Sequence, residues 1–472
     1  MKLPAILLFL ACLRLAPAFS EPLTLEIDFA KTNGLFRPLH GVNKGPLGAG
    51  GLIDLSEPTQ ALSIPFTRLH DCHWPNPDVV DIHAVFPNFE ADPDEPSSYQ
   101  FALTDDYLAA IRATGSKIIY RLGESIEHTK TRRFVHPPTD LAKWAAVCLG
   151  IIRHYNEGWA NGFHWNIEYW EIWNEPENRP SMWSGSDGDY FRLYQTAAKA
   201  IKSRFPNLKV GGPALGFSGQ FVKGEFRPSD FALAFLDLCR REPLPLDFFS
   251  WHCYTADPAE LTRRAKAIRV LLDARGFAKT ESHLNEWNYL PGNSWSPLSK
   301  SSRPEARQQY YEQMGGLPGA AFLACSLLEL QDAPVDVCNL FHGELGGFGL
   351  FNEQGVPLKN YYALLAFRKL LASGQRVETV GSLPGRLALA ASINPEKSSA
   401  ALLISNYQLP GSEFHLLLKN LPWKSNTQLQ FSLLDESHNL AVTRSEALPG
   451  GDSPFSISIK SPGVGFLELR GH

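Results

Sequence analysis

One segment of the chain shows how it is built: Ile167-Glu168-Tyr169-Trp170-Glu171-Ile172-Trp173-Asn174-Glu175-Pro176-Glu177. Its apolar and aromatic residues are typical of a buried strand, and they run directly into Asn-Glu-Pro. Proline cannot donate to a strand ladder and disfavours a helical conformation in the residue before it, so the strand must end here. The segment therefore predicts a buried strand with Glu175 at its carboxyl end.

Seven further apolar runs accompany this one between residues 39 and 372. In order, the eight runs are 39–42, 64–69, 117–122, 167–173, 209–212, 247–251, the run that begins at His283, and 335–341. Helical periodicity fills the intervals at 105–114, 140–155, 189–204, 230–240, 259–274 and 305–330. Eight strand-helix repeats predict an α/β fold, the (β/α)8 TIM barrel, whose chemistry lies at the carboxyl ends of the strands. The alternative is a doubly wound open sheet, but no run is followed by the glycine-rich phosphate fingerprint of that fold.

The pattern changes after Ser373-Gly374 to short alternating runs separated by Gly, Pro, Asn and Asp. This pattern is typical of an all-β sandwich. Residues 23–28 alternate in the same way and can supply an edge strand. The sequence therefore predicts a catalytic barrel at 36–372 and an accessory β-sandwich domain at 373–472 that also includes 21–35.

Residues 1–20 have the features of a secretory signal peptide. Lys2 is followed by an apolar stretch and then by small residues around Ala18 and Ser20, where we expect cleavage. Apolar residues continue past Cys12, so we expect no lipid anchor there. No later stretch approaches the roughly 20 apolar residues that span a bilayer. We therefore expect an exported protein, secreted or periplasmic, without a membrane span.

The composition excludes several other classes of protein. Of the 472 residues, 44% are hydrophobic and 20% are charged, which is typical of a globular protein. Lys and Arg total 44 against 49 Asp and Glu, a net charge of −5, so the basic surface of a nucleic-acid-binding protein is not expected. The cysteines are scattered, without a CxxC pair, and we expect buried free thiols, although an exported protein can hold one or two disulfides. The oligomeric state is not indicated.

A second glutamate follows a buried run in the same manner as Glu175. The seventh run reads His283-Leu284-Asn285-Glu286-Trp287, which places Glu286 at the rim of the predicted barrel. Carboxylates on the fourth and seventh strands can face one another across the barrel mouth. Hydrolysis of a glycosidic bond requires such a pair, with an acid for the leaving oxygen and a second carboxylate for the anomeric carbon.

Four motifs together resemble glycoside hydrolase family 39. They are Trp173-Asn174-Glu175-Pro176-Glu177, Val210-Gly211-Gly212-Pro213-Ala214, Ser250-Trp251-His252-Cys253-Tyr254 and Asn285-Glu286-Trp287. The resemblance covers the barrel and extends to the sandwich that members of the family carry after it. It implies a retaining mechanism in which Glu175 is the general acid/base and Glu286 is the nucleophile. The family includes β-xylosidases and α-L-iduronidases.

The two roles require different surroundings. Glu175 must be protonated near neutral pH, which requires an apolar wall and a nearby anion, and we expect Trp170, Trp173 and Glu286 to supply them. Glu286 must stay ionised, and we expect Arg68 and Tyr254 to donate hydrogen bonds to it.

Other residues at the predicted rim are candidates for binding sugar hydroxyls. Asn174 is expected to hold the 2-hydroxyl, but regular alternation would turn Asn174 and Glu175 to opposite faces, so the strand must end or bulge there. The remaining candidates are Asn43, Lys44, His70, Arg121, Glu124 and His252, with Trp74, Trp287 and Trp295 as stacking platforms.

These observations predict an exported retaining exo-glycosidase that needs no cofactor or metal. We expect β-xylosidase-like activity, or a related pentosidase activity, on polysaccharide fragments. An iduronidase-like enzyme is an alternative and would need a basic pocket, to which Lys44 and Arg121 could contribute. The residues are also compatible with a non-catalytic carbohydrate-binding barrel, or with a metal-dependent hydrolase that uses His40, His70 and His73.

Overall fold

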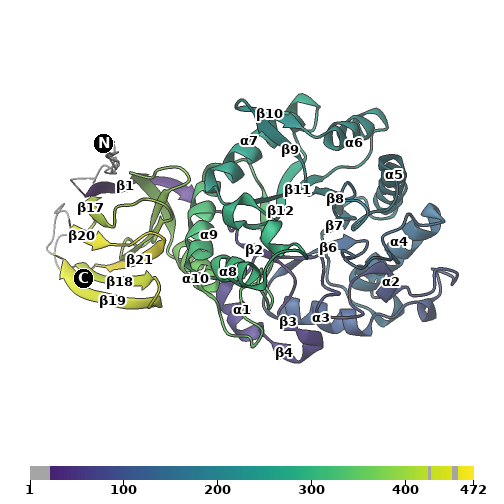
Figure 1. Cartoon of the computed structure of the whole chain (residues 1–472), viewed down its shortest axis with the longest axis horizontal. Coiled ribbons are helices and arrows are strands. Elements are labelled where there is room, and N and C mark those ends of the chain that lie inside the picture. The colour runs from purple at the N-terminus through teal and green to yellow at the C-terminus, as the bar shows by residue number, and fades with distance from the viewer. Residues whose placement is uncertain (1–21, 424–426, 449–454, 472) are drawn as a thin grey trace, which may run out of the picture.

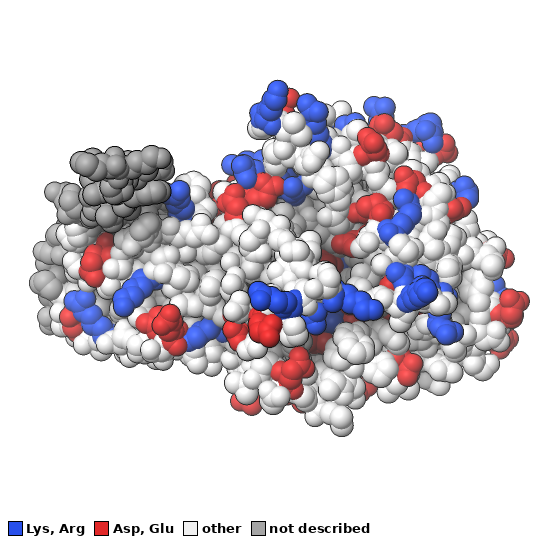
Figure 2. Space-filling view, in the orientation of Figure 1, with Lys and Arg blue, Asp and Glu red and all other residues white. Residues whose placement is uncertain are grey.

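The computed structural model describes residues 22–423, 427–448 and 455–471. The expected signal peptide and Cys12 lie outside these residues. A closed barrel and a β-domain lie side by side along the long axis of the molecule, with α9 and α10 between them (Figure 1). Lys and Arg side chains are interspersed with Asp and Glu on the face shown in Figure 2. Of the described helices, none has the length and apolar character to cross a membrane.

Eight parallel strands close the barrel, and each corresponds to one of the predicted apolar runs. In chain order they are β2 (Gly41–Asn43), β5 (Phe66–Leu69), β6 (Lys117–Leu122), β7 (Tyr169–Ile172), β8 (Lys209–Leu215), β11 (Phe248–Thr255), β12 (Glu281–Tyr289) and β13 (Val337–Leu340). Each strand pairs in parallel with its neighbours, and β13 pairs with β2 to close the ring. The predicted barrel is therefore confirmed.

Helices connect these strands and surround the barrel. They are α1 (Ser56–Leu62), α2 (Ile82–Val85), α3 (Ala102–Ala113), α4 (Leu141–Glu157), α5 (Asp187–Arg204), α6 (Asp230–Arg241), α7 (Pro258–Ala274), α8 (Pro304–Gly315), α9 (Leu317–Glu329) and α10 (Lys359–Ala372). The hairpin β9 (Gly219–Val222) and β10 (Glu225–Pro228) lies between β8 and α6. The single helix predicted at 305–330 is wrong, because Gly316 is extended, with φ −89° and ψ −164°, and divides it into α8 and α9.

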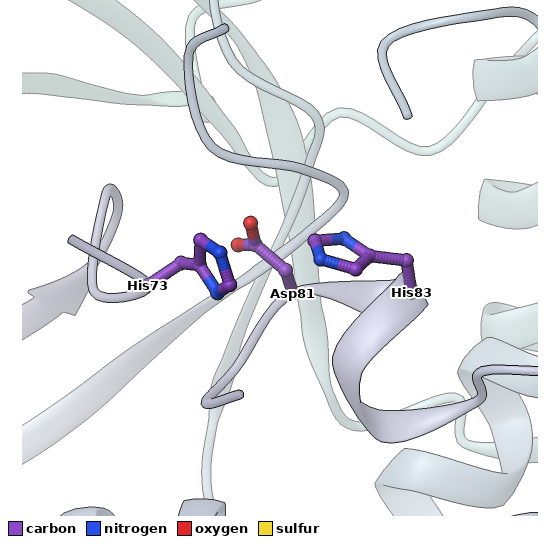
Figure 3. Close-up of side chains that lie close together, drawn as sticks. All are labelled: His73, Asp81 and His83. Atoms are coloured by element: carbon purple, nitrogen blue, oxygen red, sulfur yellow. The ribbon is translucent and has the colours of Figure 1, made fainter. Parts of the chain in front are cut away.

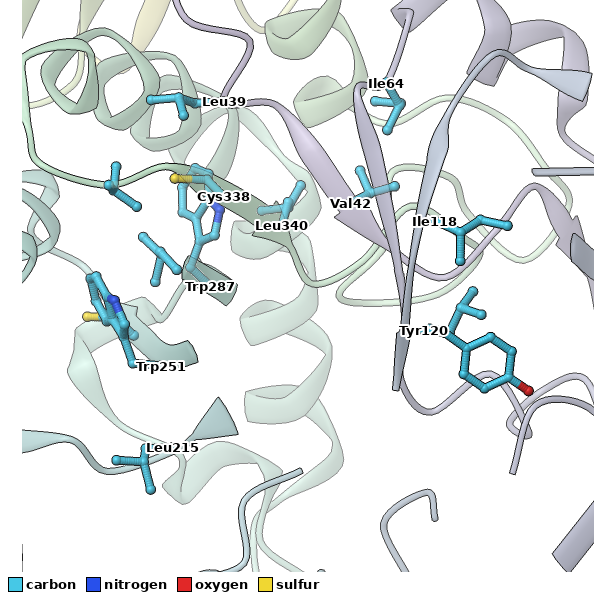
Figure 4. Packing of buried hydrophobic residues seen from close by; sticks show 14 of the residues in the cluster. Leu39, Val42, Ile64, Ile118, Tyr120, Leu215, Trp251, Trp287, Cys338 and Leu340 are labelled. Carbon is cyan, nitrogen blue, oxygen red and sulfur yellow. The ribbon is translucent and has the colours of Figure 1, made fainter. Parts of the chain in front are cut away.

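The barrel has an apolar outer surface and a partly polar interior. Side chains that point outward, such as Val42, Leu215 and Trp251, pack between the strands and the helices (Figure 4). Inside, Ile119, Tyr169, Phe248 and Val337 form a small separate apolar cluster. The interior also holds a buried polar network that leads to the mouth. The six described cysteines are all buried and free, as their apolar surroundings predict.

The β-domain consists of one nine-stranded sheet that curls around its own core. Its strands are β1 (Leu23–Leu35), β14 (Gln375–Val380), β15 (Leu387–Ile393), β16 (Ser399–Asn406), β17 (Glu413–Lys419), β18 (Thr427–Leu434), β19 (Asn439–Leu448), β20 (Phe455–Ser458) and β21 (Gly463–Arg470). The two halves of the curled sheet enclose residues such as Leu25, Leu402 and Phe414, which gives the sandwich that the sequence predicts.

The first strand of the β-domain is not at an edge of the sheet, contrary to the prediction for 23–28. β1 pairs antiparallel with β14 and parallel with β17, so it lies inside the sheet. The buried side chains of Leu25, Ile27 and Phe29 explain this position, because each packs in the core of the β-domain. An interior strand buries these side chains and pairs its backbone on both sides.

The outer face of the β-domain packs on the barrel helices. Leu403 and Phe466 of the sheet belong to the same apolar core as the barrel. Polar contacts fix the arrangement, since Ser405 Oγ donates to the Ala321 carbonyl of α9 at 2.7 Å. The β-domain therefore supports one side of the barrel, and none of its described residues lines the cavity presented below.

Candidate active site

The backbone at the end of β7 brings Asn174 and Glu175 to the same side. Trp173 and Glu175 have positive φ angles of 70° and 44°, which interrupt the alternation of the strand. The turned backbone stays attached to both neighbouring strands. The Trp173 N–H donates to the Leu122 carbonyl at 2.8 Å, and the Glu175 N–H donates to the Ala214 carbonyl at 3.0 Å. The regular strand therefore ends before Asn174, so that Asn174 and Glu175 can both reach the barrel mouth. Such an end or bulge was predicted from the sequence.

A β-bulge in β12 directs Glu286 into the mouth. Between Leu284 and Glu286 the ladder to β11 skips Asn285, so β12 has one more residue than its partner here. A bulge bends a strand and changes the direction of the side chains around it. Consecutive residues of β12, Asn285 and Glu286, consequently both contact side chains inside the barrel.

The bulge also explains why Trp287 is not a sugar platform, contrary to the prediction. Regular alternation from His283 would turn Trp287 inward, whereas the additional residue at Asn285 turns it outward. The Trp287 side chain is fully buried, and its ring lies 6.3 Å from that of Phe322 in α9 (Figure 4). Trp287 belongs to the core between the barrel and the helices.

Arg68, on β5, is fully buried and binds four side chains. Its Nε donates to Glu171 Oε2 at 2.7 Å, and its Nη2 donates to Asn174 Oδ1 at 2.6 Å. Its Nη1 donates to Asn43 Oδ1 at 3.0 Å and to Glu286 Oε2 at 3.2 Å. A planar guanidinium with five N–H donors can fix several acceptors at once. Arg68 is thus the cation expected beside Glu286, and it also orients Asn174.

Glu171 is a buried carboxylate that the sequence motifs did not single out. Its Oε2 accepts from Arg68, and its Oε1 accepts from Ser250 Oγ at 2.6 Å and from Asn285 Nδ2. A charged residue in an otherwise apolar strand was the available signal, because buried acids are rare unless they are paired. Glu171 supplies the charge that allows Arg68 to remain buried beneath Glu286.

Two side chains of β11 contact the glutamates. Tyr254 Oη donates to Glu286 Oε1 at 2.7 Å. His252 Nδ1 lies 2.8 Å from Glu175 Oε1 and 3.8 Å from Glu286 Oε2. One atom each from Glu175, His252 and Glu286 lie within 4.8 Å of one another. The structure therefore brings together Glu175, Glu286, His252 and Tyr254, all of which the sequence placed at the rim.

Burial and charge act differently on the two glutamates. Burial raises the pKa of Glu175, but the hydrogen bond and charge of His252 outweigh it, so this pKa lies below its ordinary value. Burial raises the pKa of Glu286, the charge of Glu175 raises it further, and His252 and Arg68 offset this only in part. Burial lowers the pKa of His252, but Glu286 and Glu175 outweigh burial and raise it. Glu175 and His252 therefore each favour the charged form of the other.

The apolar wall predicted for Glu175 is absent from the described part of the site. Trp170 and Trp173 are buried in the barrel core, where Trp170 stacks on Tyr120 with ring centroids 5.0 Å apart. Trp170 turns outward toward the helices by the regular alternation of β7, and the positive φ of Trp173 turns that side chain outward as well. Polar groups surround Glu175 instead, since Asn178 Nδ2 donates to its Oε2 at 2.8 Å.

A cavity of about 880 Å³ opens above the two glutamates. Its aromatic wall includes Trp295, whose ring lies 4.9 Å from that of Tyr254. Four carboxylates line it, and no lysine or arginine among the described residues does. The lining residues are His70, Asp71, Ile126, His128, Glu175, Glu177, Asn178, Met182, Gly216, Phe217, Tyr254, Glu286, Trp295, Leu298, Tyr311, Phe341 and Phe348. The cavity has the size of a small-molecule site and an acidic lining.

Several predicted sugar ligands are used elsewhere. Lys44 Nζ donates to the Trp74 carbonyl at 2.6 Å, and Arg121 is fully buried and pairs with Asp81 at 2.6 Å, so neither cation lines the cavity. Asn43 donates to the Asn285 carbonyl at 2.9 Å and accepts from Arg68, which makes it part of the support beneath Glu286. The structure places each of these side chains below the rim, away from the lining of the cavity.

The remaining candidates divide between the cavity and its surroundings. His70 and Trp295 line the cavity, whereas Trp74 is 77% exposed and lies outside it. Glu124 pairs with His83 at 2.5 Å. His40 lies near α1, 3.1 Å from the Leu62 carbonyl, so His40, His70 and His73 do not form the metal centre of a metal-dependent hydrolase.

Two site residues that follow Glu175 closely, Glu177 and Asn178, were not identified from the sequence. Asn178 contacts Glu175, and Glu177 lines the cavity and accepts from the Phe217 N–H at 2.8 Å. Burial raises the pKa of Glu177 to about 7, and the charge of Glu175 contributes. The signal was the sequence Glu175-Pro176-Glu177-Asn178, in which a proline-containing turn returns the chain to the same rim.

The fold and the site together define a class of protein. β7 and β12 are the fourth and seventh strands of a parallel barrel, and each carries a glutamate into one cavity, which is the arrangement of barrel glycosidases. The family model for glycosyl hydrolases family 39 matches residues 66–302, about half of the chain. The chain belongs to this family.

Two curated relatives are β-xylosidases. That of Geobacillus stearothermophilus is 28% identical over 261 residues, which cover 50% of this chain and 48% of that protein. That of Caldicellulosiruptor saccharolyticus is 28% identical over 297 residues, which cover 56% of this chain and 52% of that protein. The chain spans about half the length of the curated relatives it matches.

Similar solved structures cover nearly the whole chain. A glucosidase from Croceicoccus marinus aligns with a TM-score of 0.80 and 25% identity, over 96% of this chain and 100% of that one. A monomeric β-xylosidase from Caulobacter crescentus aligns with a TM-score of 0.70 and 16% identity, over 95% and 99% of the two chains. The second likeness shows the barrel with its β-domain and no more.

Proposed function

We propose that this chain is a retaining exo-glycosidase that hydrolyses glycosides of neutral sugars by double displacement. One observation carries the proposal: atoms of Glu175, His252 and Glu286 lie within 4.8 Å of one another. Retaining enzymes hold their carboxyl groups about 5–5.5 Å apart, and inverting enzymes about 6.5–9.5 Å apart. The short separation favours direct attack by one carboxylate on the anomeric carbon, with no room for a water between them.

In the proposed mechanism, Glu286 attacks the anomeric carbon. Tyr254 donates to one of its oxygens and Arg68 to the other, so the attacking carboxylate is oriented and its charge is stabilised. Glu175, which can exchange a proton with His252 Nδ1 2.8 Å away, donates a proton to the leaving oxygen. Glu175 then takes a proton from the water that hydrolyses the covalent intermediate. Asn174, which Arg68 holds in place, binds the sugar 2-hydroxyl.

The lining of the cavity argues for a neutral substrate. Asp71, Glu175, Glu177 and Glu286 contribute carboxyl groups to the lining, whereas Arg68 binds Glu286 from below and no lysine or arginine among the described residues lines the cavity itself. A uronate would bring its negative charge into this field without a cation to bind it. An iduronidase-like activity therefore has no support here, and a purely carbohydrate-binding role does not explain why two carboxylates share His252.

Among neutral sugars we propose a xyloside or a related pentoside. The curated relatives are named β-xylosidases, at 28% identity. A glucoside is the second candidate, because a solved glucosidase is 25% identical over 96% of this chain. Initial rates on 4-nitrophenyl xyloside, arabinoside, glucoside and glucuronide separate these substrates, and the highest kcat/KM on the glucuronide would contradict a neutral substrate. We also propose export, which the sequence of residues 1–20 supports.

Replacement of Glu286 by glycine tests the mechanism. Glu286→Gly should lose nearly all activity on an activated aryl glycoside, and azide should restore turnover by entering the vacated space as an external nucleophile. The glycosyl azide then has the inverted configuration at the anomeric carbon, because a single displacement has replaced two. A variant that retains full activity, or a wild-type product of inverted configuration, would refute the nucleophile assignment.

A further inference from the structure

Three metal-ligating side chains meet in the loop between β5 and α3. His73, Asp81 and His83 each offer one atom, and these atoms all lie within 4.8 Å of one another (Figure 3). The rings of His73 and His83 pack edge to face, with centroids 5.1 Å apart, and the Asp81 carboxylate lies beside them. Asp81 is buried, whereas both histidines are partly exposed and can adjust. Their spacing in the sequence matches no metal motif, and only the path of the loop brings them together.

The outer contacts of His83 resemble those of a metal ligand. Its Nδ1 lies 2.5 Å from Oε2 of Glu124, a residue of the loop after β6. A histidine that donates one ring N–H to a carboxylate is fixed in one tautomer, and its other nitrogen becomes a better ligand. In Figure 3 the ring of His83 points toward Asp81. Glu124 therefore has the position of a carboxylate that orients a metal-binding histidine, here His83.

The Asp81 carboxylate can accept one more hydrogen bond or metal bond. Its Oδ1 accepts from Arg121 Nη2 at 2.6 Å and from Ser125 Oγ at 3.0 Å, and its Oδ2 accepts from the Ser125 N–H at 2.8 Å. A carboxylate has about four acceptor positions, so about one remains, on Oδ2. Two carboxyl groups, those of Asp81 and Glu124, thus contact the cluster, against one guanidinium, that of Arg121.

We propose that His73, Asp81 and His83 form a structural zinc site. Two imidazoles and one carboxylate suit Zn²⁺ better than Mg²⁺ or Ca²⁺, which prefer shells of oxygen ligands. Bonds of about 2.0–2.2 Å in a tetrahedron place ligand atoms about 3.4 Å apart, so the histidines turn inward by about an ångström as the ion binds. Water completes the tetrahedron.

One existing contact opposes binding. The Asp78 N–H donates to His73 Nδ1 at 3.2 Å, and this hydrogen bond favours the tautomer whose proton is on Nε2. Coordination through Nε2 moves that proton to Nδ1 and breaks the bond. A neutral hydrogen bond contributes only about 1 kcal/mol, whereas zinc–ligand bonds are far stronger.

The zinc would cross-link the segment between β5 and α3, which forms part of the cavity wall, and Glu124 joins His83 of this segment to the loop after β6. His70 and Asp71 precede the cluster and line the cavity, and Asp71 Oδ1 accepts from the Ile126 N–H at 2.9 Å. Ile126 and His128 of the second loop line the same cavity. The ion would act on the position of this wall and takes no part in the reaction of Glu175 and Glu286.

Metal titrations of the full chain test the proposal. The wild type, His73→Ala, His83→Ala and the matched control His164→Ala, which removes an exposed histidine, are stripped with a chelator and titrated calorimetrically with Zn²⁺. The wild type and His164→Ala should bind one zinc per chain, and each of the other variants should bind at least tenfold more weakly. Co²⁺ should give the visible absorption of a tetrahedral site only in the wild type and the control.

His73→Ala is the decisive variant, because its ring accepts only the Asp78 bond among the described polar contacts. Its far-ultraviolet circular dichroism and metal-free melting temperature should match the wild type, while the rise in melting temperature with Zn²⁺ is lost. Zinc binding of equal affinity in the wild type and His73→Ala would overturn the proposal. So would a wild type that binds no zinc.

Discussion

Arg68 and Glu171 form an ion pair in which neither side chain is exposed, with 2.7 Å between Nε and Oε2. The same guanidinium donates to Glu286, 3.2 Å away. Glu171 and Glu286, the proposed nucleophile, therefore share the positive charge of Arg68. A change in the charge of Glu171 on β7 should alter the electrostatic interaction between Arg68 and Glu286 on β12.

Loss of the Glu171 charge should destabilise the barrel. Glu171→Gln preserves the shape of the side chain but leaves Arg68 buried with one counterion fewer, and removal of one partner from a buried pair costs about 3–5 kcal/mol. The free energy of unfolding from urea titrations measures this loss. Glu157→Gln is the control, because Glu157 pairs at 2.7 Å with Arg204, which is more than half exposed, and we expect a change below about 1 kcal/mol. Equal losses in the two variants would contradict the argument.

Loss of the Tyr254 hydroxyl should slow catalysis and move its pH profile. Tyr254→Phe removes a donor to Glu286 Oε1, and a hydrogen bond to a charged group contributes about 1.5–3 kcal/mol, so kcat should fall by about 10- to 100-fold. The lost hydrogen bond lowered the pKa of Glu286, so this pKa rises in the variant. Because Glu286 acts in its ionised form, the acidic limb of kcat/KM should move to higher pH. Tyr311→Phe removes a hydroxyl from the same cavity and should leave that limb in place.

Two tryptophans near the cavity should respond differently to truncation. Trp295 lines the cavity, is 48% exposed and packs beside Tyr254, so it can stack on a sugar. Trp295→Ala should raise KM by about three- to tenfold with a smaller effect on kcat. Trp74→Ala removes a more exposed ring outside the cavity and should change neither. Initial-rate kinetics on an aryl glycoside decide this, and an equal rise in KM for both variants would exclude the stacking role.

Glu281, at the start of β12, should make the free energy of unfolding depend on pH in the acidic range. Burial raises the pKa of Glu281, but His283 and Lys209 outweigh it and lower this pKa to about 2. Because the folded-state pKa is depressed from its ordinary value of 4.5, the contribution is complete above pH 4.5 and is lost as pH falls toward 2. After allowance for a quarter-exposed side chain, we expect about 2 kcal/mol.

Glu281→Gln should therefore unfold more readily than the wild type at pH 7, and the difference should disappear as pH falls from 4.5 to 2. Glu168→Gln is the matched control, since Glu168 contacts the same Lys209 at 3.2 Å but has a half-exposed side chain. Thermal melts across this pH range provide the measurement. A difference that stays constant with pH would show that the shifted pKa is not the cause.

The sequence predicted the fold well because its signals were local and repeated. Each barrel strand is a short apolar run, and Glu175, Glu286, Tyr254 and His252 follow such runs directly. A regular register was enough to place these four at one rim. The β-domain followed from equally local alternation.

The errors arose where the backbone departs from regularity or where distant segments meet. The bulge at Asn285 turned Trp287 away from the cavity, which alternation alone could not reveal. Arg121 and Lys44 follow predicted strands and were therefore expected at the rim. Below the rim, however, Asp81 binds Arg121 and the Trp74 carbonyl binds Lys44. Glu171 was missed because its partner Arg68 lies 103 residues away in the sequence.

The interior position of β1 has a consequence for how the protein is made. Leu35 pairs with Gln375, so the first strand emerges from the ribosome 340 residues before its partner. At about 5–20 residues per second, this strand waits roughly 17–70 s before its sheet can form. The barrel can assemble during that interval, while Leu25, Ile27 and Phe29 stay exposed to solvent or to a chaperone. Completion of the β-domain therefore comes last in synthesis, even though its first strand is made first.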